Sequence, residues 1–230
     1  MVPGLAVAQD ISLNLGNDAS LTNRAVQLIG LITVLSLAPS ILVMVTSFTR
    51  IVVVLSLLRT AIGLQTTPPN SVMVSLALFL TAFIMAPTLT QTYNVGVAPL
   101  LDGSITVQQA FDRGQVPLHS FMAANVRDQD VKLFYDLSNQ APPDDATGIP
   151  LQILVPAFMI SELRRAFEIG FLLFLPFVII DMVVASVLMS MGMMMLPPVV
   201  ISLPFKLIFF VLVDGWSLVA GSLVRSFVSG

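Results

Sequence analysis

Three single charges stand in strongly apolar stretches of the sequence: Asp181, Lys206 and Asp214. Two carboxylates that share a proton are the machinery of an aspartyl protease, so Asp181 and Asp214 raise the possibility of a membrane enzyme. The Gly-x-Gly-Asp context of an intramembrane protease is missing, because Asp181 follows Ile-Ile and Asp214 follows Leu-Val. A charge in apolar surroundings needs a partner, and we expect Asp181 to pair with Lys206. The three charges could alternatively form an ion or solute pathway.

Other catalytic and metal-binding patterns are missing from the sequence. His119 is the only histidine and there is no cysteine, so neither a multi-histidine site nor a thiolate site can form. The sequence also lacks His-Glu-x-x-His, Gly-x-Ser-x-Gly and a phosphate-binding glycine loop. We therefore predict a protein that is not an enzyme and has no metal or cofactor.

A charged island interrupts apolar sequence between Glu162 and Glu168. Glu162 and Arg165 are three residues apart, and Arg164 and Glu168 are four apart, so both pairs can form on one helix. One interpretation is a self-neutralising helix face at a membrane boundary. The other is a subunit interface whose charges find partners on another chain.

A methionine cluster is the strongest local anomaly of the sequence. Five of the 12 methionines lie within seven residues: Met189, Met191, Met193, Met194 and Met195. Gly192 and the following Pro197-Pro198 predict a non-helical loop over 189–196. Flexible thioethers could close an opening against small ions and deform around something larger, as a soft gasket. Packing filler is the plainer alternative, and a copper(I) site would usually need a histidine or cysteine as well.

The composition is that of a membrane protein. Hydrophobic residues make up 56% of the 230 residues and charged residues only 10%, against about 25% in a typical soluble protein. The net charge of -3 provides no basic field for nucleic acid, and the composition excludes a disordered or disulfide-stapled chain. We expect contact with membrane lipid.

Four apolar segments are long enough to form helices that cross a bilayer: 27–58, 71–93, 151–200 and 203–224. Prolines interrupt them at positions 39, 87, 156, 176, 197, 198 and 204. We therefore predict broken helices in the first three segments and expect the last segment to be the one closest to a simple rod. The expected fold is all-α, an integral membrane protein of proline-broken helical hairpins built for a multi-subunit helical assembly. Ordinary proline kinks are the alternative.

The polar region 94–150 separates the first hairpin, 27–93, from the second apolar region, 151–230. Three basic residues oppose seven aspartates there, which favours a small extracytoplasmic helical domain, whereas Arg50 and Arg59 suit the cytoplasmic side.

Two amphipathic helices are predicted within this polar region. Apolar residues recur at helical spacing in two groups: Leu118, Phe121 and Met122, then Val131, Phe134 and Tyr135. This apolar stripe packs either in the domain's own core or against a neighbouring copy.

The N-terminus suggests export. Ala6-Val7-Ala8 has the form of a signal-peptidase site, so we interpret 1–8 as the remnant of a signal peptide and 9–26 as an exported leader; a chance match is the alternative.

Two long segments resemble a known family. Pro156–Phe171 (PAFMISELRRAFEIGF) and Pro204–Trp216 (PFKLIFFVLVDGW) resemble the two signatures of the FliP family, a flagellar biosynthesis protein of the type III export apparatus. Met191–Pro198 (MGMMMLPP) is also similar to that family. Injectisome homologues share the pattern, but the Val-Asp-Gly-Trp ending and the methionine run are more similar to the flagellar members.

The resemblance implies an export gate in the bacterial inner membrane at the flagellar basal body. Five copies would join FliQ and FliR in a closed channel entrance, FlhB would associate with it, and unfolded flagellar subunits would pass through. Met191, Met193, Met194 and Met195 would form the gasket around the pore. Residues at contacts between copies would be Phe121, Phe134, Glu162, Arg164, Arg165 and Glu168. The family's helical hairpins would lie partly above the bilayer plane, so apolar segments can be buried by protein instead of lipid.

Overall fold

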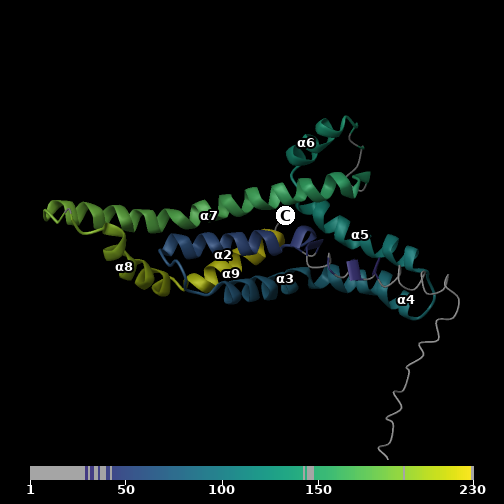
Figure 1. Cartoon of the computed structure of the whole chain (residues 1–230), viewed down its shortest axis with the longest axis horizontal. Coiled ribbons are helices and arrows are strands. Elements are labelled where there is room, and N and C mark those ends of the chain that lie inside the picture. The colour runs from purple at the N-terminus through teal and green to yellow at the C-terminus, as the bar shows by residue number, and fades with distance from the viewer. Residues whose placement is uncertain are drawn as a thin grey trace, which may run out of the picture. The chain divides into compact units, whose positions relative to one another are not determined.

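The computed structural model describes residues 29, 30, 32, 33, 36, 40, 41, 43–141, 143, 148–193 and 195–228. Every regular element among these residues is a helix, which confirms the all-α prediction (Figure 1). The chain divides into two compact units, residues 1–41 and 42–230. All the candidate functional residues that the structure describes lie in the second unit. The predicted signal-peptide remnant and exported leader, and Met194, lie outside the described residues.

The second unit is a succession of helices: α2 (Phe48–Ile62), α3 (Asn70–Thr92), the π-helix η1 (Tyr93–Val97), α4 (Ala98–Leu101), α5 (Val107–Asn125), α6 (Asp128–Ser138), α7 (Leu151–Ser190), α8 (Pro198–Leu212) and α9 (Gly215–Val228). Among the described residues, two helical stretches are long and apolar enough to cross a membrane, Asn70–Leu101 and Leu151–Ser190. The pair α8 and α9 could add a third span if its two helices count as one.

Prolines do not break the long helices, contrary to our expectation. Pro87 lies inside α3, Pro156 and Pro176 lie inside the 40-residue α7, and Pro204 lies inside α8. Each proline removes one backbone donor, and packing against neighbouring helices can offset that loss. Of the seven prolines expected to interrupt helices, Pro39 lies outside the described residues, and among the other six only Pro197-Pro198 mark a helix boundary. The fixed φ of Pro198 suits the first residue of α8.

The segment expected to be the simplest rod is the one that breaks. α8 ends at Leu212, α9 begins at Gly215, and the two axes differ by 63°. Asp214 adopts a left-handed φ of 51° at the break, and its side chain is exposed instead of buried as predicted. A Cβ on Gly215 would lie 2.2 Å from the Phe210 ring, so the first residue of α9 has to be glycine in this packing.

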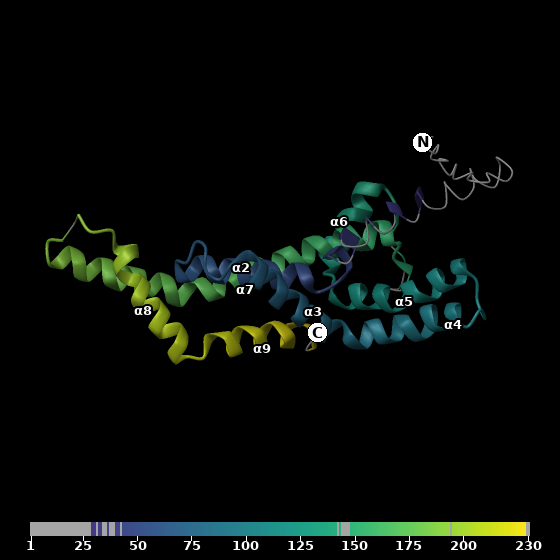
Figure 2. The same cartoon turned by 60° about the horizontal axis from the view of Figure 1, so that its bottom comes forward.

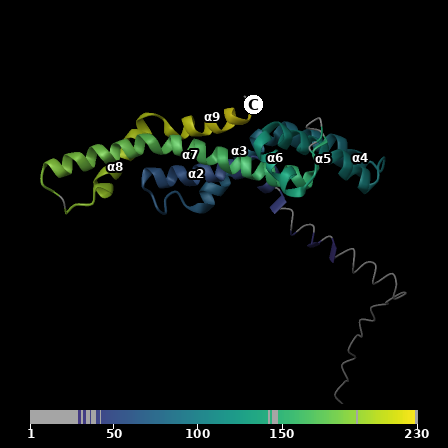
Figure 3. The ribbon, with the colours of Figure 1, turned by 90° about the horizontal axis from the view of Figure 1, so that it is seen from above.

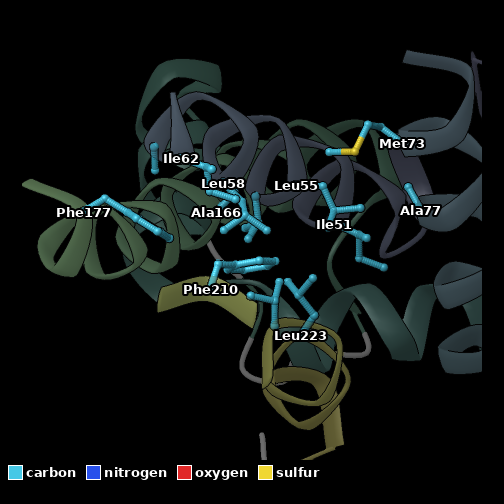
Figure 4. Close-up of a cluster of buried hydrophobic side chains, with 13 residues drawn as sticks. Ile51, Leu55, Leu58, Ile62, Met73, Ala77, Ala166, Phe177, Phe210 and Leu223 are labelled. Atoms are coloured by element: carbon cyan, nitrogen blue, oxygen red, sulfur yellow. The ribbon is translucent and has the colours of Figure 1, made fainter. Parts of the chain in front are cut away.

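α2 is the central helix of the main core. It runs alongside α7 in all three views (Figures 1, 2 and 3), and α9 contributes Val219 and Leu223 to the same core. α2 contributes a fully buried row that meets α3, α7, α8 and α9 (Figure 4); its members are Ile51, Val54, Leu55 and Leu58. Burying each such side chain stabilises the fold by about 1.5–3 kcal/mol. A 15-residue helix is therefore held in place by its packing on several sides.

A second core joins α5 and α6 to the first turns of α7. Met122 of α5 and Val131 and Tyr135 of α6 pack with Leu154 and Phe158 of α7. The two predicted amphipathic helices are thus present, and the apolar stripe packs in the chain's own core. Thr106 and Gln109 form a capping box at the start of α5, which explains why the helix begins well before the predicted stripe.

Candidate functional site

A buried ion pair joins α2 to α7. Nε of Arg50 donates to Oε2 of Glu162 at 2.8 Å, Nη2 of Arg50 donates to Oε1, and both side chains are 0% exposed. The paired geometry matches the planar guanidinium to the planar carboxylate. Glu162 therefore forms its ion pair with Arg50 instead of Arg165, and Arg50 is buried within the chain.

The position of Glu162 corrects its predicted place at a contact between copies. The carboxylate lies inside the single chain, because the packing of α2 along α7 brings Arg50 to it across 112 residues of sequence. Helical spacing within α7 could not reveal this partner.

Arg50 also fastens the C-terminal helix. Nη1 of Arg50 donates to the carbonyl oxygen of Ser226 at 3.1 Å and to its hydroxyl at 2.9 Å, and the guanidinium lies 3.6 Å from the centre of the Phe227 ring. The Phe227 ring stacks on Phe121 of α5, with ring centres 6.0 Å apart. One guanidinium thus holds α2, α7 and α9 together.

The two aromatic residues predicted at contacts between copies are half-buried. Phe121 meets Phe158 edge to face at a centroid distance of 5.9 Å, in addition to its stacking on Phe227. Phe134 of α6 packs at the border of the second core. Each therefore has partners within the chain and leaves part of its ring at the surface.

A second ion pair joins α7 to α8. Nζ of Lys206 lies 2.7 Å from Oδ2 of Asp181, which confirms the predicted pairing, and it also donates to the carbonyl oxygen of Ala61 at 3.3 Å. The Ser202 hydroxyl donates to the other Asp181 oxygen. The ammonium is almost fully buried and the carboxylate side chain is 32% exposed. The charges neutralise each other and fix α8 against the end of α2.

Arg164 and Glu168 form the exposed ion pair that their spacing predicts. Nε of Arg164 lies 3.2 Å from Oε1 of Glu168, and the side chains are 56% and 60% exposed. Arg165 is half-buried beside them. α7 thus carries a self-neutralising charged face directly before its long apolar stretch.

The methionine loop joins α7 to α8 and projects its side chains outward. Met191, Met193 and Met195 are 64%, 37% and 98% exposed, and Gly192 turns the chain with a φ of 75°. The predicted non-helical loop is present, although Met189 belongs to the last turn of α7. These three side chains do not fill the core of the chain, so the packing-filler interpretation does not hold for them within one copy.

The structure allows a search for metal ligands and for a pair of catalytic aspartates. The described residues contain no group of three or more histidine, cysteine, aspartate or glutamate side chains that could hold a metal ion. Nε2 of His119 forms a hydrogen bond of 2.7 Å with the carbonyl oxygen of Ile149. Asp181 is occupied by Lys206 and Ser202, and Asp214 is exposed at the α8–α9 turn, so the two aspartates lack the shared setting of a proton-sharing dyad.

Large apolar side chains cover the outside of the long helices. Examples from α3, α7 and α8 with at least 59% exposure are Phe79, Phe83, Phe167, Phe171, Val211 and Leu212. Such a surface is too apolar to face water and requires cover by lipid or by other protein chains.

The sequence analysis did not predict the contacts of Arg50 with Glu162, Ser226 and Phe227. Arg50 directly follows the charge-free run 25–49 and precedes an apolar stretch, which is the signal that led us to Asp181 and Lys206. Ser161 was missed as well: its hydroxyl donates to Asp130 at 2.6 Å and accepts from the backbone amide of Arg127 at 3.1 Å, which ties α6 to α7.

The sequence of this chain matches a known protein family. The model of the FliP family matches residues 31–223. The flagellar biosynthetic protein FliP of Caulobacter vibrioides is 62% identical over 231 residues, covering 100% of this chain and 87% of that protein. Its counterpart in Bacillus subtilis is 51% identical over 217 residues, covering 94% of this chain and 98% of that protein. Because the family model matches residues 31–223 and these relatives match nearly the whole chain, this chain belongs to the FliP family.

Proposed function

We propose that this chain is the core pore-forming subunit of the flagellar type III protein export gate, which passes unfolded flagellar subunits across the bacterial inner membrane. The observation that carries the proposal is the methionine loop, where Met195 is 98% exposed between two helices that buried ion pairs hold in place. Flexible methionine side chains on a rigid support suit a seal that must deform and close again.

The seal requires several copies. One loop cannot enclose an opening, whereas a ring of five copies would bring five sets of Met191, Met193, Met194 and Met195 to one axis. The exposed apolar faces of α3, α7 and α8 provide surface for such packing and for lipid. Phe121, Phe134, Arg164, Arg165 and Glu168 remain our candidates for contacts between copies.

The proposed assembly includes FliQ and FliR as further gate subunits, with FlhB associated, at the flagellar basal body. Region 94–150 would lie on the periplasmic side. The relatives named flagellar biosynthetic protein FliP support a place in flagellar biosynthesis, and the two span-length helices support a membrane location.

An ion or solute pathway through Asp181 and Lys206 is less favoured. Lys206 is almost fully buried, holds the Ala61 carbonyl as well as the carboxylate, and so acts as a fixed clamp between helices. A conducting pathway would need charges that can exchange partners.

The experiment is removal of Met193–Met195 from the gate. Cells that carry the deletion should leak small ions across the inner membrane and should still export flagellin at least in part. Replacement of Met189, which belongs to α7, by leucine is the matched control and should leave the leak at its wild-type level. An unchanged ion leak in the deletion strain would refute the gasket.

A further inference from the structure

The methionine loop between α7 and α8 carries the most exposed thioether that the structure describes. Met195 is 98% exposed and Met191 is 64% exposed, whereas Met85 and Met122 are 0% and 1% exposed. The end of α7 that carries the loop extends beyond the end of α2 (Figures 1 and 3). Oxidation of a methionine requires contact between its sulfur and the oxidant, so this exposure separates the loop from the buried methionines.

Exposure in a single chain does not by itself distinguish the loop from the rest of α7. Met182 is 66% exposed, but it lies within the span-length α7, whose apolar surface requires cover by lipid or protein. In the proposed gate the loop methionines line the pore instead. A closed ring of side chains still has two rims that face water, and hydrogen peroxide, a molecule nearly as small as water, can reach them.

Oxidation by peroxide would change the property that makes the loop a seal. The sulfur attacks one peroxide oxygen, the O–O bond breaks and an S–O bond forms, while the other oxygen leaves as water with both protons. The sulfur loses two electrons, which the peroxide gains, and the flexible apolar side chain becomes a polar sulfoxide. Residues 182–205 contain no charged side chain, so the unmodified loop lies in an uncharged stretch. An apolar constriction blocks ions by excluding water, whereas a polar ring would hold water.

We propose that the methionine loop is an oxidation site that controls the seal. Hydrogen peroxide converts the loop thioethers to sulfoxides, and the oxidised gate leaks small ions; the four residues are Met191, Met193, Met194 and Met195. A methionine sulfoxide reductase would restore the thioether, with two thiols oxidised to a disulfide and the oxygen released as water. The inference rests on the proposed export function, because only a ring of loops around a pore can leak when it is oxidised.

The first measurement maps the oxidation. Cells that carry the complete gate are exposed briefly to hydrogen peroxide, and the sulfoxide at each methionine is quantified by mass spectrometry of proteolytic fragments. We expect at least about tenfold more sulfoxide at Met195 than at Met122, because a buried sulfur reacts only when the fold opens, and an opening free energy of about 1.4 kcal/mol already corresponds to that factor. Met191 should also exceed Met182, although the two are nearly equally exposed in one chain.

The second measurement follows the ion leak of the same cells. Peroxide should raise the leak across the inner membrane at least about fivefold, because a sulfoxide oxygen disfavours the closed, water-free seal as any buried polar group without a partner does. A variant with leucine at all four positions cannot be oxidised there, so peroxide should add nothing to the leak that it has before treatment. Met182→Leu is the matched control, because it removes an exposed thioether outside the loop, and it should keep the full response to peroxide.

Three outcomes would overturn the inference. Equal sulfoxide at Met191 and Met182 would show that the loop has no special access to water. Loop sulfoxides without a rise in the ion leak would show that oxidation does not open the seal. An equal peroxide response in the four-leucine variant would place the leak elsewhere. The proposed function fails by a different result, an unchanged leak after deletion of Met193–Met195 in cells that receive no peroxide.

Discussion

Removal of either partner of the Arg50–Glu162 pair should destabilise the chain strongly. Both side chains are 0% exposed, so Glu162→Gln leaves an uncompensated guanidinium in the core. Breaking such a buried pair costs about 3–5 kcal/mol, against about 0–1 kcal/mol for an exposed pair. Arg50→Met should cost at least as much, because it leaves the Glu162 carboxylate unpaired and also removes the contacts to Ser226 and Phe227.

The double variant provides the decisive comparison. Arg50→Met with Glu162→Gln removes both charges at once, so it should be more stable than the sum of the single effects predicts, by at least about 1.5 kcal/mol of coupling. The assay is thermal unfolding of the full chain in mild detergent, where about 2–4 °C of Tm corresponds to 1 kcal/mol for a protein of this size. Arg164→Gln, at the exposed pair, is the matched control and should shift the Tm by less than about 4 °C.

The reasoning about this pair is refuted by additive single effects, or by Tm losses as small as that of Arg164→Gln. Either result would show that Arg50 and Glu162 do not hold each other's charge in the folded chain.

Three further predictions use the same unfolding assay. Lys206→Met should destabilise the chain by about 2–5 kcal/mol, since it leaves Asp181 without its cation in apolar surroundings. Adding Asp181→Asn should recover part of the lost stability, and no recovery would mean that the two charges are not coupled. Asp214→Gly should raise the stability by about 0.5–1 kcal/mol because glycine adopts the φ of 51° without strain, and a lowered Tm would contradict the bent α8–α9 turn. Gly215→Ala should destabilise the chain by about 1–3 kcal/mol through overpacking against the Phe210 ring, whereas a neutral effect would show that this ring can move aside.

Apolar patterning predicted where the helices lie but not where they end. The span-length α3 and α7 and the two helices of region 94–150 follow from hydrophobicity and spacing. Helix ends were harder to predict. A proline usually ends or kinks a helix, but packing keeps the helix continuous at four of them: Pro87, Pro156, Pro176 and Pro204. The actual break at Asp214–Gly215 has no proline, and glycine alone is a weaker signal.

The sequence predicted an ion pair correctly where only a few charged residues could be partners. Asp181 and Lys206 were the natural partners because each stood alone in an apolar stretch. Glu162 had a plausible partner on its own helix, so the sequence offered no reason to search for Arg50 in a segment more than 100 residues away. Local spacing describes exposed pairs such as Arg164–Glu168, whereas a buried pair depends on which helices pack together.

The most direct test of the export-gate account is native mass spectrometry of the full chain purified in mild detergent, alone and co-expressed with FliQ and FliR. The account predicts one defined homo-oligomer of five copies that gains both smaller partners on co-expression. A chain that stays monomeric under both conditions would contradict a shared pore, because a single methionine loop cannot close one.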